Sequence, residues 1–459
     1  MRVPYLASTS FTSNRIKTTS PLRVLVVGRR LFPVFGCFIF MEKIDIIKLM
    51  RQLPLDFMAQ TAEELKVDYK AKKLTAMRLF ALLLIGFLRH SRLSQRMVCE
   101  QSSSVWLDEF LKIDIGASHL SHSSIADRLS TISPEYFSRV YEELLRRAEV
   151  FIPPEELEDS GIIRIDTTMV SETCAKLREG IISGINKRFG GEKKFVKYGI
   201  AYDGFSSVFE EVFTQQHASG DETALGSTVT ASIENCGKPG ETFVFDRGIT
   251  SYNTLCRIRH LCAQKGCHFV SRLKLGRICH VESPVVIEGA RLRDDEFKIM
   301  EDCAAFLNRP PRSDYGKERF RIIRVRFTRP RPKTLPSARR RRYEPEMLLI
   351  TDDFDAEPLT IAHDYKKRWG IEVFYKFMKQ NLSFSHLLST SRNGIEVMLY
   401  MTLITAVLIK IYAAANKIGP TMALERMIVQ IENWIYTHPL PETCRRILKS
   451  RKISNKSPD

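Results

Sequence analysis

The 459-residue sequence lacks several features that define specialised classes of protein. Its ten cysteines form no disulfide framework and no secretory signal peptide is recognised, so we expect free thiols in a reducing cytoplasm. Cysteines and histidines gather in residues 256–280, but without a C-x2-C pair, and structural zinc is not predicted. The apolar stretch 397–409 has only Thr402 and Thr405 as polar residues, yet a transmembrane helix needs about 20 apolar residues. We therefore expect a buried helix packed on the sheet there and no membrane partner.

Acidic residues are too few to balance the basic ones. The chain has 70 Lys and Arg against 53 Asp and Glu, a net charge of +17 and a pI near 9.4. Such an excess calls for a polyanionic partner, with nucleic acid as the first candidate and a membrane surface as the second. Residues 1–40 contain six basic residues and no acidic one, and Met41 opens a segment that reads like a natural protein start. We interpret 1–40 as a disordered basic arm or an over-extended start, and the sequence does not decide between translation from Met1 and from Met41.

The strongest charge imbalance lies in a segment that otherwise resembles β-structure. Residues 309–342 hold fourteen Lys or Arg against two acidic residues, and no acidic run nearby matches them. Residues 319–327 alternate enough to form a strand with a bulge at Ile322 and Ile323. Charge runs are usually solvated, but this density on a strand favours a β-rich module lying on a phosphate backbone. The predicted DNA contacts are Arg319, Arg321, Arg324 and Arg326 on the strand and Arg339, Arg340, Arg341 and Arg342 in the following loop.

Short strand signals occupy the middle of the chain. The pattern GIIRID predicts a strand that ends at Asp166, stopped by Thr167 and Thr168. The TFVFD pattern predicts a second strand that ends at Asp246, after which Thr250 or Ser251 caps a helix. Further strands are predicted at 196–202 and 207–213, joined by a two-residue Asp203-Gly204 turn, and at 267–273 and 347–351.

Residues 365–379 carry a polar stripe along a predicted helix. At about 100° per residue, Tyr365, Arg368, Glu372 and Lys379 fall within roughly 60° of one another, and the opposite face is apolar. A solvated face with i,i+4 ion pairs explains the stripe equally well in isolation. The two strand-end carboxylates upstream favour a functional site.

The spacing Tyr365-x2-Arg368-x3-Glu372-x6-Lys379 resembles the Tyr-Arg-Glu-Lys signature of DDE-type transposases of the bacterial insertion sequence 4 family. Asp166-Thr167-Thr168 is similar to the first acidic motif of that family, and Asp246-Arg247-Gly248 is similar to the second. Ile249 stands where the family often has an aromatic residue, a place that Tyr252 could take. The resemblance implies that Asp166, Asp246 and Glu372 are the catalytic, metal-binding carboxylates and that Tyr365, Arg368 and Lys379 hold DNA phosphates.

Geometry agrees with a metal site. Adjacent strands lie about 4.8 Å apart, so Asp166 and Asp246 meet if their strands are neighbours, and the helix of Glu372 brings a third carboxylate. Three hard oxygen ligands in an open site suit Mg²⁺ or Mn²⁺, and two such ions serve phosphoryl transfer.

The resemblance implies an α/β fold: a ribonuclease H-like (retroviral-integrase-like) catalytic core with a β-rich insertion, preceded by an all-helical domain. The expected divisions are the arm at 1–40, a helical N-terminal DNA-binding domain at 41–150, the core at 151–276 and 347–392, the insertion at 277–346, and a helical region with a tail at 393–459. The sequence alone shows no clear helix-turn-helix there and also fits a helical packing domain, whereas the family resemblance supports recognition of transposon ends.

The predicted function is that of an insertion-sequence transposase. Such a protein binds terminal inverted repeats of double-stranded DNA and carries out metal-dependent cleavage and strand transfer, as a homodimer in a synaptic complex on the cytoplasmic nucleoid. The alternatives are a catalytically inert or repurposed DNA-binding protein and a nuclease of the same fold.

Overall fold

The structure is a computed structural model that describes residues 23–27, 30–34, 43–104, 106–113, 119–148, 161–171, 177, 179–185, 191–277, 279–328 and 345–438. The chain divides into two compact units, 1–42 and 43–459. In the first unit, strands β1 (Arg23–Val27) and β2 (Arg30–Val34) pair antiparallel. This hairpin differs from the disordered arm predicted for 1–40, because the apolar and β-branched residues of RVLVV and RLFPV favour a strand.

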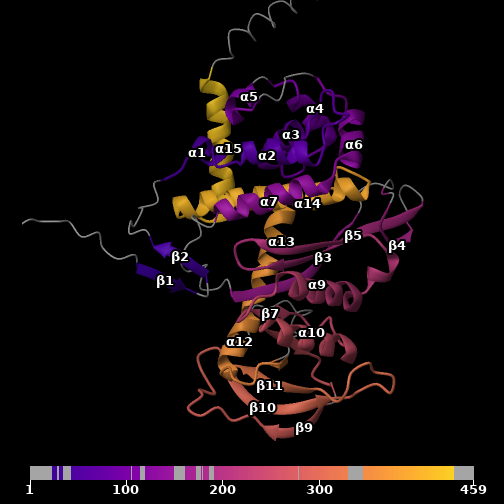
Figure 1. The fold of residues 1–459 in the computed structure, drawn as a ribbon, viewed down its shortest axis with the longest axis vertical. Helices are drawn as coiled ribbons and strands as arrows, with labels where there is room; N and C mark the ends of the chain where they lie inside the picture. The colour runs from indigo at the N-terminus through magenta and orange to yellow at the C-terminus, as the bar shows by residue number, and fades with distance from the viewer. Residues whose placement is uncertain are drawn as a thin grey trace, which may run out of the picture. The chain divides into compact units, whose positions relative to one another are not determined.

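The second unit begins with a helical module (Figure 1), in which the described residues from 43 to 148 form the helices α1 to α7. Their ends follow sequence signals, since the side chains of Thr75, Ser94 and Ser121 each cap the helix that follows. The helices are α1 (Ile46–Met50), α2 (Leu55–Glu64), α3 (Ala76–Arg89), α4 (Gln95–Gln101), α5 (Trp106–Leu111), α6 (His122–Thr131) and α7 (Pro134–Ala148).

The module is completed by two helices from the end of the chain, α14 (Arg392–Asn416) and α15 (Pro420–Thr437). Helix α14 packs against α7, α15, α6 and α3, and Figure 1 shows it alongside α7. It is long and apolar enough to cross a membrane, but 83% of its most apolar stretch is buried inside the protein. The segments predicted as separate divisions at 41–150 and 393–459 therefore share one hydrophobic core.

A ten-stranded mixed sheet forms the rest of the unit. Its strand order is β4-β5-β3-β7-β8-β12-β11-β10-β9, with β6 pairing the other side of β5. Strands β3, β7 and β8 are parallel neighbours, and the other pairs are antiparallel. The strands are β3 (Ile162–Ser171), β4 (Ile181–Ile185), β5 (Glu192–Tyr202), β6 (Ser207–Phe213), β7 (Thr242–Phe245), β8 (His268–Leu273), β9 (Cys279–Pro284), β10 (Phe297–Leu307), β11 (Arg319–Phe327) and β12 (Glu346–Thr351).

Helices cover both faces of this sheet. Helices α9 (Asp221–Cys236) and α10 (Tyr252–Lys265) share one apolar cluster with β3, β7 and β8. Helix α12 (Pro358–Lys367) packs on the opposite face of the same strands, and α13 (Trp369–Asn381) runs from there to the helical module. Because both faces are covered, the central strands are continuous runs of apolar residues. A short 3-10 helix, η3 (Gln216–Ser219), precedes α9.

Two details of the predicted strands are wrong. Strand β3 does not stop at Thr167 and Thr168 but continues to Ser171, because β5 pairs with it over that whole length. The hairpin of β5 and β6 is confirmed, but its turn has four residues, in which the Asp203 carboxylate accepts hydrogen bonds from the amides of Phe205 and Ser206.

The insertion is β-rich, as predicted, but its strands extend the central sheet through β12. The bulge lies on β10, between Ile299 and Glu301, and not on β11 at Ile322 and Ile323. Both isoleucines are nevertheless buried, because Ile322 belongs to the cluster of α10 and Ile323 to the cluster of α12. The two consecutive apolar residues therefore reflect burial of both faces of the sheet and do not mark a bulge.

Candidate active site

The first two carboxylates lie where parallel pairing ends. The register of β3 and β7 runs from Ile162 opposite Thr242 to Ile165 opposite Phe245, so the next residues are Asp166 and Asp246. Their strands are direct neighbours, which meets the condition that the sequence analysis set for the two carboxylates to lie side by side. Strand β3 carries Asp166 within the ladder to β5, whereas Asp246 begins the loop after β7.

The third carboxylate lies on α13, just after an interruption of the predicted helix. Residues 365–379 do not form one helix, because Arg368 separates α12 from α13 and the hydrogen bonds around it tighten to i,i+3. The buried Arg164 of β3 lies against this junction and donates from Nε to the carbonyl of Lys367 at 3.0 Å. A Cβ on Gly370 would lie 3.4 Å from Cδ and Nε of Arg164, an ordinary contact distance, so the arginine packs directly against the start of α13.

Tyr365 and Arg368 contact the carboxylates directly. The Tyr365 hydroxyl donates to Oδ1 of Asp246 at 3.0 Å, and Nη2 of Arg368 lies 2.6 Å from Oε1 of Glu372. Burial, reinforced by Asp246, raises the pKa of the Tyr365 phenol, which keeps its proton as a donor. Burial alone would lower the pKa of Arg368, but the surrounding acidic groups raise it overall, and its charge is secure.

Asp166 is the carboxylate with the least favourable surroundings for its charge. Burial raises its pKa to about 6, and Glu372 and Asp246 add to the rise, while the Thr167 amide and Arg368 oppose it. The Thr167 amide donates to Oδ1 of Asp166 at 2.8 Å. These mutual effects show that the three carboxylates and Arg368 share one electrostatic environment.

Helix α13 is fastened to β3 beyond the carboxylates. The buried Tyr375 donates from its hydroxyl to the carbonyl of Asp166 at 2.8 Å. Nζ of Lys379 donates to the Thr168 hydroxyl and, at 3.3 Å, to the carbonyl of Met169. Burial lowers the pKa of Lys379, and Asp166 counteracts this. Tyr365 and Arg368 therefore lie against carboxylates of the site, and Lys379 of α13 contacts β3 close to Asp166.

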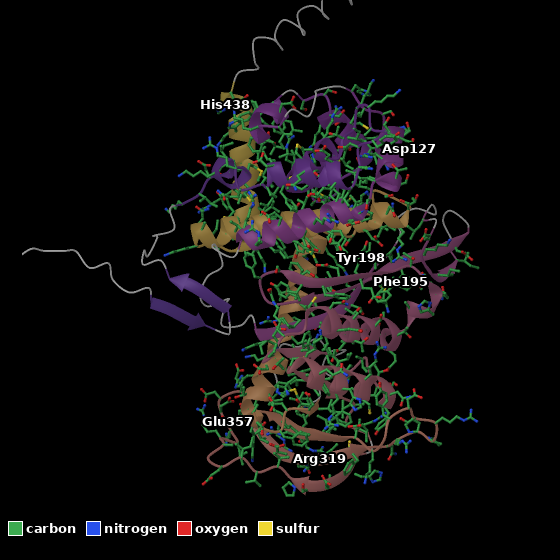
Figure 2. The ribbon with its side chains drawn as sticks, viewed as in Figure 1. Asp127, Phe195, Tyr198, Arg319, Glu357 and His438 are labelled. Atoms are coloured by element: carbon green, nitrogen blue, oxygen red, sulfur yellow. The ribbon has the colours of Figure 1, made fainter. Side chains whose placement is uncertain are left out.

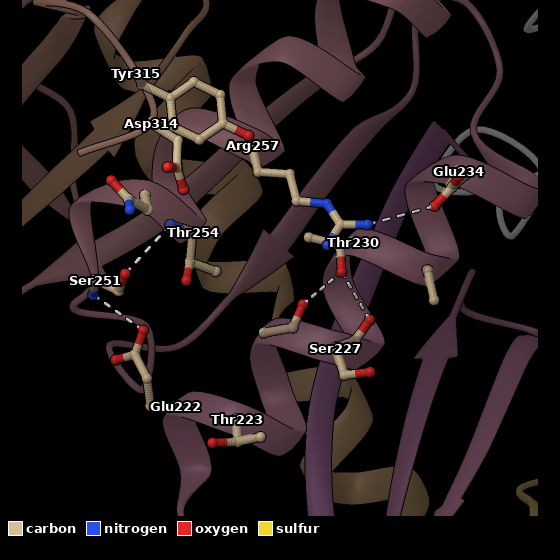
Figure 3. A pocket seen from close by; sticks show the side chains of 13 residues that line it. Glu222, Thr223, Ser227, Thr230, Glu234, Ser251, Thr254, Arg257, Asp314 and Tyr315 are labelled. Atoms are coloured by element: carbon tan, nitrogen blue, oxygen red, sulfur yellow. Dashed lines mark hydrogen bonds and ion pairs between the residues drawn. The ribbon is translucent and has the colours of Figure 1, made fainter. Parts of the chain in front are cut away.

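The loop after Asp246 is fixed from behind by α9. Glu222, in the first turn of α9, accepts hydrogen bonds from the Thr250 amide and hydroxyl and from the Ser251 amide. Figure 3 shows Glu222 and Ser251 at one end of a cavity of about 850 Å³ between α9 and α10. None of the three carboxylates lines this cavity. It is a polar space behind the loop, distinct from the site.

Three supporting residues were missed by sequence reasoning: Arg164, Tyr375 and Glu222. An arginine inside the apolar strand pattern GIIRID was the available signal for Arg164. The prediction that Tyr252 takes the place of the aromatic residue that the family often has at the position of Ile249 is wrong. Both side chains are buried in the core, and the Tyr252 hydroxyl is engaged by the carbonyl of Gly316 and the amide of Glu318.

The chemistry of the donor set fits divalent cations, since three carboxylates provide the hard oxygen ligands that Mg²⁺ prefers. Among the described residues, no three His, Cys, Asp or Glu side chains are gathered closely enough to hold an ion as they stand. Tyr365 and Arg368 bond to two of the carboxylates, and Arg368 supplies the positive charge beside Glu372.

The arginines of β11 do not match the prediction. Arg321 is fully buried in a two-pronged pair with Asp302 of β10, and it also donates to the carbonyls of Asp353 and Ala356. It therefore cannot face DNA. The premise that no acidic partners lie nearby was wrong, because neighbouring strands supply them: Arg319 pairs with Glu282, Arg324 with Glu301, and Arg326 with Glu346.

These three partly exposed arginines remain candidates for DNA contact. Figure 2 marks Arg319 among the strands of the insertion. Each of them forms an ion pair with a carboxylate, which a DNA phosphate would have to displace. Arg339, Arg340, Arg341 and Arg342 lie outside the described residues, and their role stays a prediction.

The fold fits the ribonuclease H-like core of a transposase. Its large mixed sheet has three parallel neighbouring strands and helices on both faces, and two carboxylates lie where the parallel pairing ends. Residues 162–408 match the family described as "Transposase DDE domain". The chain belongs to this family.

Similar proteins agree with that assignment. "Putative transposase y4zB" of Sinorhizobium fredii is 25% identical over 231 residues, 50% of this chain and 56% of the relative. "Putative transposase for insertion sequence element IS4SA" of Synechocystis is 33% identical over 89 residues, 19% of this chain and 26% of that protein. The matches thus span about half the length of the first relative and a quarter of the second.

One solved structure is also similar. It is the piggyBac transposase in a synaptic complex with hairpin DNA, with 12% identity, a TM-score of 0.40, and coverage of 90% of this chain and 86% of that one.

Proposed function

We propose that the chain is the transposase of an insertion sequence, which binds the terminal inverted repeats of its element and catalyses cut-and-paste transposition. The observation that carries this proposal is the register that ends at Asp166 and Asp246, with Glu372 brought beside them by α13. The insertion sequence 4 signature supports it further. The proposed setting is the nucleoid of the cytoplasm, with a homodimer holding two element ends.

In this proposal Asp166, Asp246 and Glu372 hold two Mg²⁺ or Mn²⁺ ions. When bound, such ions stabilise the attacking and leaving oxygens of an in-line phosphoryl displacement. The protein needs no nucleophile of its own. Tyr375 and Arg164 tie α13 and the helix junction to β3, and so fix the segments that carry Asp166 and Glu372 relative to each other.

Tyr365, Arg368 and Lys379 would bind the phosphates at the cleavage point. The planar guanidinium of Arg368, which pairs with Glu372 in the structure, would be able to hold a phosphate through two hydrogen bonds. Lys379 donates hydrogen bonds to Thr168 and Met169, which lie on the same strand as Asp166.

Replacing Arg368 or Lys379 with Ala should weaken binding of the element ends. The slope of log affinity against log salt should become shallower by about one unit for each lost phosphate contact. Titrations over a range of salt concentrations, with thermal melts alongside, measure this. The control is Lys366→Ala, which removes an exposed lysine of α12 that pairs with Glu296. Unfolding without a change in the salt slope would show that the stripe is a structural ion-pair network.

The function itself is tested with a supercoiled plasmid that carries both ends of the element. Incubation with the protein and Mg²⁺ should cut at the ends and join them to target DNA, and chelation should stop both reactions. Cutting without joining would establish the nuclease alternative. Binding without cutting in Mg²⁺ or Mn²⁺ would establish the inert DNA-binding alternative.

A further inference from the structure

A second charged cavity lies in the helical module. Its volume is about 610 Å³, and none of the three carboxylates lines it. One wall is the segment between α2 and α3, with Lys70, Lys72 and Lys73, and the other is the beginning of α6, with Ser121 and Ser124. We name it the lysine cleft.

The cleft is held in shape by an ion pair between its walls. Arg128 of α6 donates from Nη1 to the carbonyl of Val67 at 2.9 Å and pairs through Nη2 with Asp68. The same oxygen of Asp68 accepts the amide of Ala76, at the start of α3. The side chain of Arg128 is only 12% exposed, so this pair is protected from water. The three lysines therefore project from a segment, residues 67–76, that is anchored by hydrogen bonds at both ends.

The lysines carry charge that the described part of the protein does not neutralise. All three are exposed, and no ion pair joins any of them to a described carboxylate. The exposed arginines of nearby α7 behave differently, because Arg139 pairs with Glu135 and Arg146 with Glu143. Of the described residues that line the cleft, only Asp127 is acidic, and Figure 2 marks it on α6. The cleft is thus a local concentration of unpaired positive charge.

The opposite wall adds donors for an anion. Helix α6 has ten residues, and its N-terminal end faces the cleft with Ser121 as its cap. The Ser121 hydroxyl lies 2.8 Å from those of Ser123 and Ser124, so the hydroxyl hydrogens can turn from one another to a ligand. The partial positive charge of the helix end acts in the same direction as the lysines.

We propose that the lysine cleft binds the sugar-phosphate backbone of duplex DNA, with the first turn of α6 against a phosphate. This inference rests on the proposed function, which makes duplex DNA the partner. The cleft is open and lined along one wall by three separate cations, which suits a run of phosphates better than a single small anion. Lysines act as point charges, so the contact should be independent of base sequence.

The test is the full-length triple variant Lys70→Gln, Lys72→Gln, Lys73→Gln. Affinity for a terminal-repeat duplex and for an unrelated duplex should fall by a similar factor, at least about tenfold, and the salt slope should become shallower by about two to three units. The matched control removes the same charge at exposed lysines elsewhere, through Lys43→Gln, Lys238→Gln and Lys417→Gln, and should change neither duplex affinity nor slope. Both variants should melt as the wild type does.

Other outcomes would overturn the inference. If the wild type binds the terminal repeat and the cleft variant binds it equally well, the cleft is a solvated surface while the proposed function stands. A selective loss for the terminal repeat would show that the cleft reads bases and not the backbone. Tighter binding of the wild type to vesicles of anionic phospholipid than to duplex, lost in the cleft variant, would assign the cleft to a membrane surface. Failure of the wild type to bind any duplex would instead refute the proposed function.

Discussion

Asp246→Asn is expected to abolish DNA cleavage while DNA affinity remains close to that of the wild type. The substitution removes one negatively charged ligand oxygen, and the loss of several kcal/mol of transition-state stabilisation corresponds to a rate at least about a thousandfold lower. Asp166→Asn and Glu372→Gln should behave alike. Nicking of an end-labelled duplex in Mg²⁺ measures the rate, and titration in Ca²⁺ measures affinity.

Asp352→Asn is the matched control for these variants. Asp352 follows β12 as Asp246 follows β7, but its Oδ1 accepts the amide of Phe269, a bond that asparagine can keep. The control should cleave at the wild-type rate. A near wild-type rate in any of the three site variants would remove that residue from the proposed site. A parallel loss of affinity in all three would indicate a structural role.

Arg321→Ala is expected to lower the free energy of unfolding by about 3–5 kcal/mol, because it leaves the buried Asp302 without its partner. The arginine also satisfies the carbonyls of Asp353 and Ala356, at the turn that leads from β12 to α12. Its loss should therefore loosen the start of the segment that carries Tyr365 and Arg368. Equilibrium unfolding in urea measures the change.

Arg326→Ala is the comparison on the same strand. Arg326 is half exposed in its pair with Glu346, and surface pairs of this kind contribute about 0–1 kcal/mol. The two variants should therefore differ by several kcal/mol in stability. Unchanged stability of Arg321→Ala together with weaker DNA binding would restore the original prediction that Arg321 faces DNA.

Local pattern predicted the elements that position the site. The apolar runs that end in Asp166 and Asp246 indicated two strands, which the structure shows to be neighbours, and the spacing from Tyr365 to Lys379 indicated a polar stripe. The strands could be predicted because each pattern depends on residues a few positions apart. The interruption at Arg368 was missed, since the Arg164 side chain that bonds to the Lys367 carbonyl there is about 200 residues away in sequence.

Contacts between residues far apart along the chain could not be predicted from the sequence. The charge of 309–342 suggested an exposed surface, because nothing local shows that Asp302 lies opposite Ile323 in the ladder and next to Arg321. Helix α9 was not predicted at all. Its sequence, DETALGSTVTASIENC, is rich in serine and threonine, which have low helix propensity, and burial between β3 and α10 stabilises it.

The shared core of the helical module also escaped prediction. The apolar pattern at 397–409 correctly predicted a buried helix, but the prediction that it packs on the sheet is wrong, because α14 packs mainly on α7 and α15. The sheet and the module are joined through α13, which belongs to the core of the module and carries Glu372. Mutations in the module can therefore change the position of Glu372 through this helix.

The central claim is that carboxylates from β3, the end of β7 and α13 form one metal site. Iron(II) bound in place of magnesium, with ascorbate and peroxide, cleaves the polypeptide beside the metal, and the fragments can be mapped by mass spectrometry. The account predicts cuts near Asp166, Asp246 and Glu372 together, suppressed by excess Mg²⁺ and lost in Asp246→Asn. Cuts clustered elsewhere in the chain, or none at these three positions while Mg²⁺ supports DNA cleavage, would contradict it.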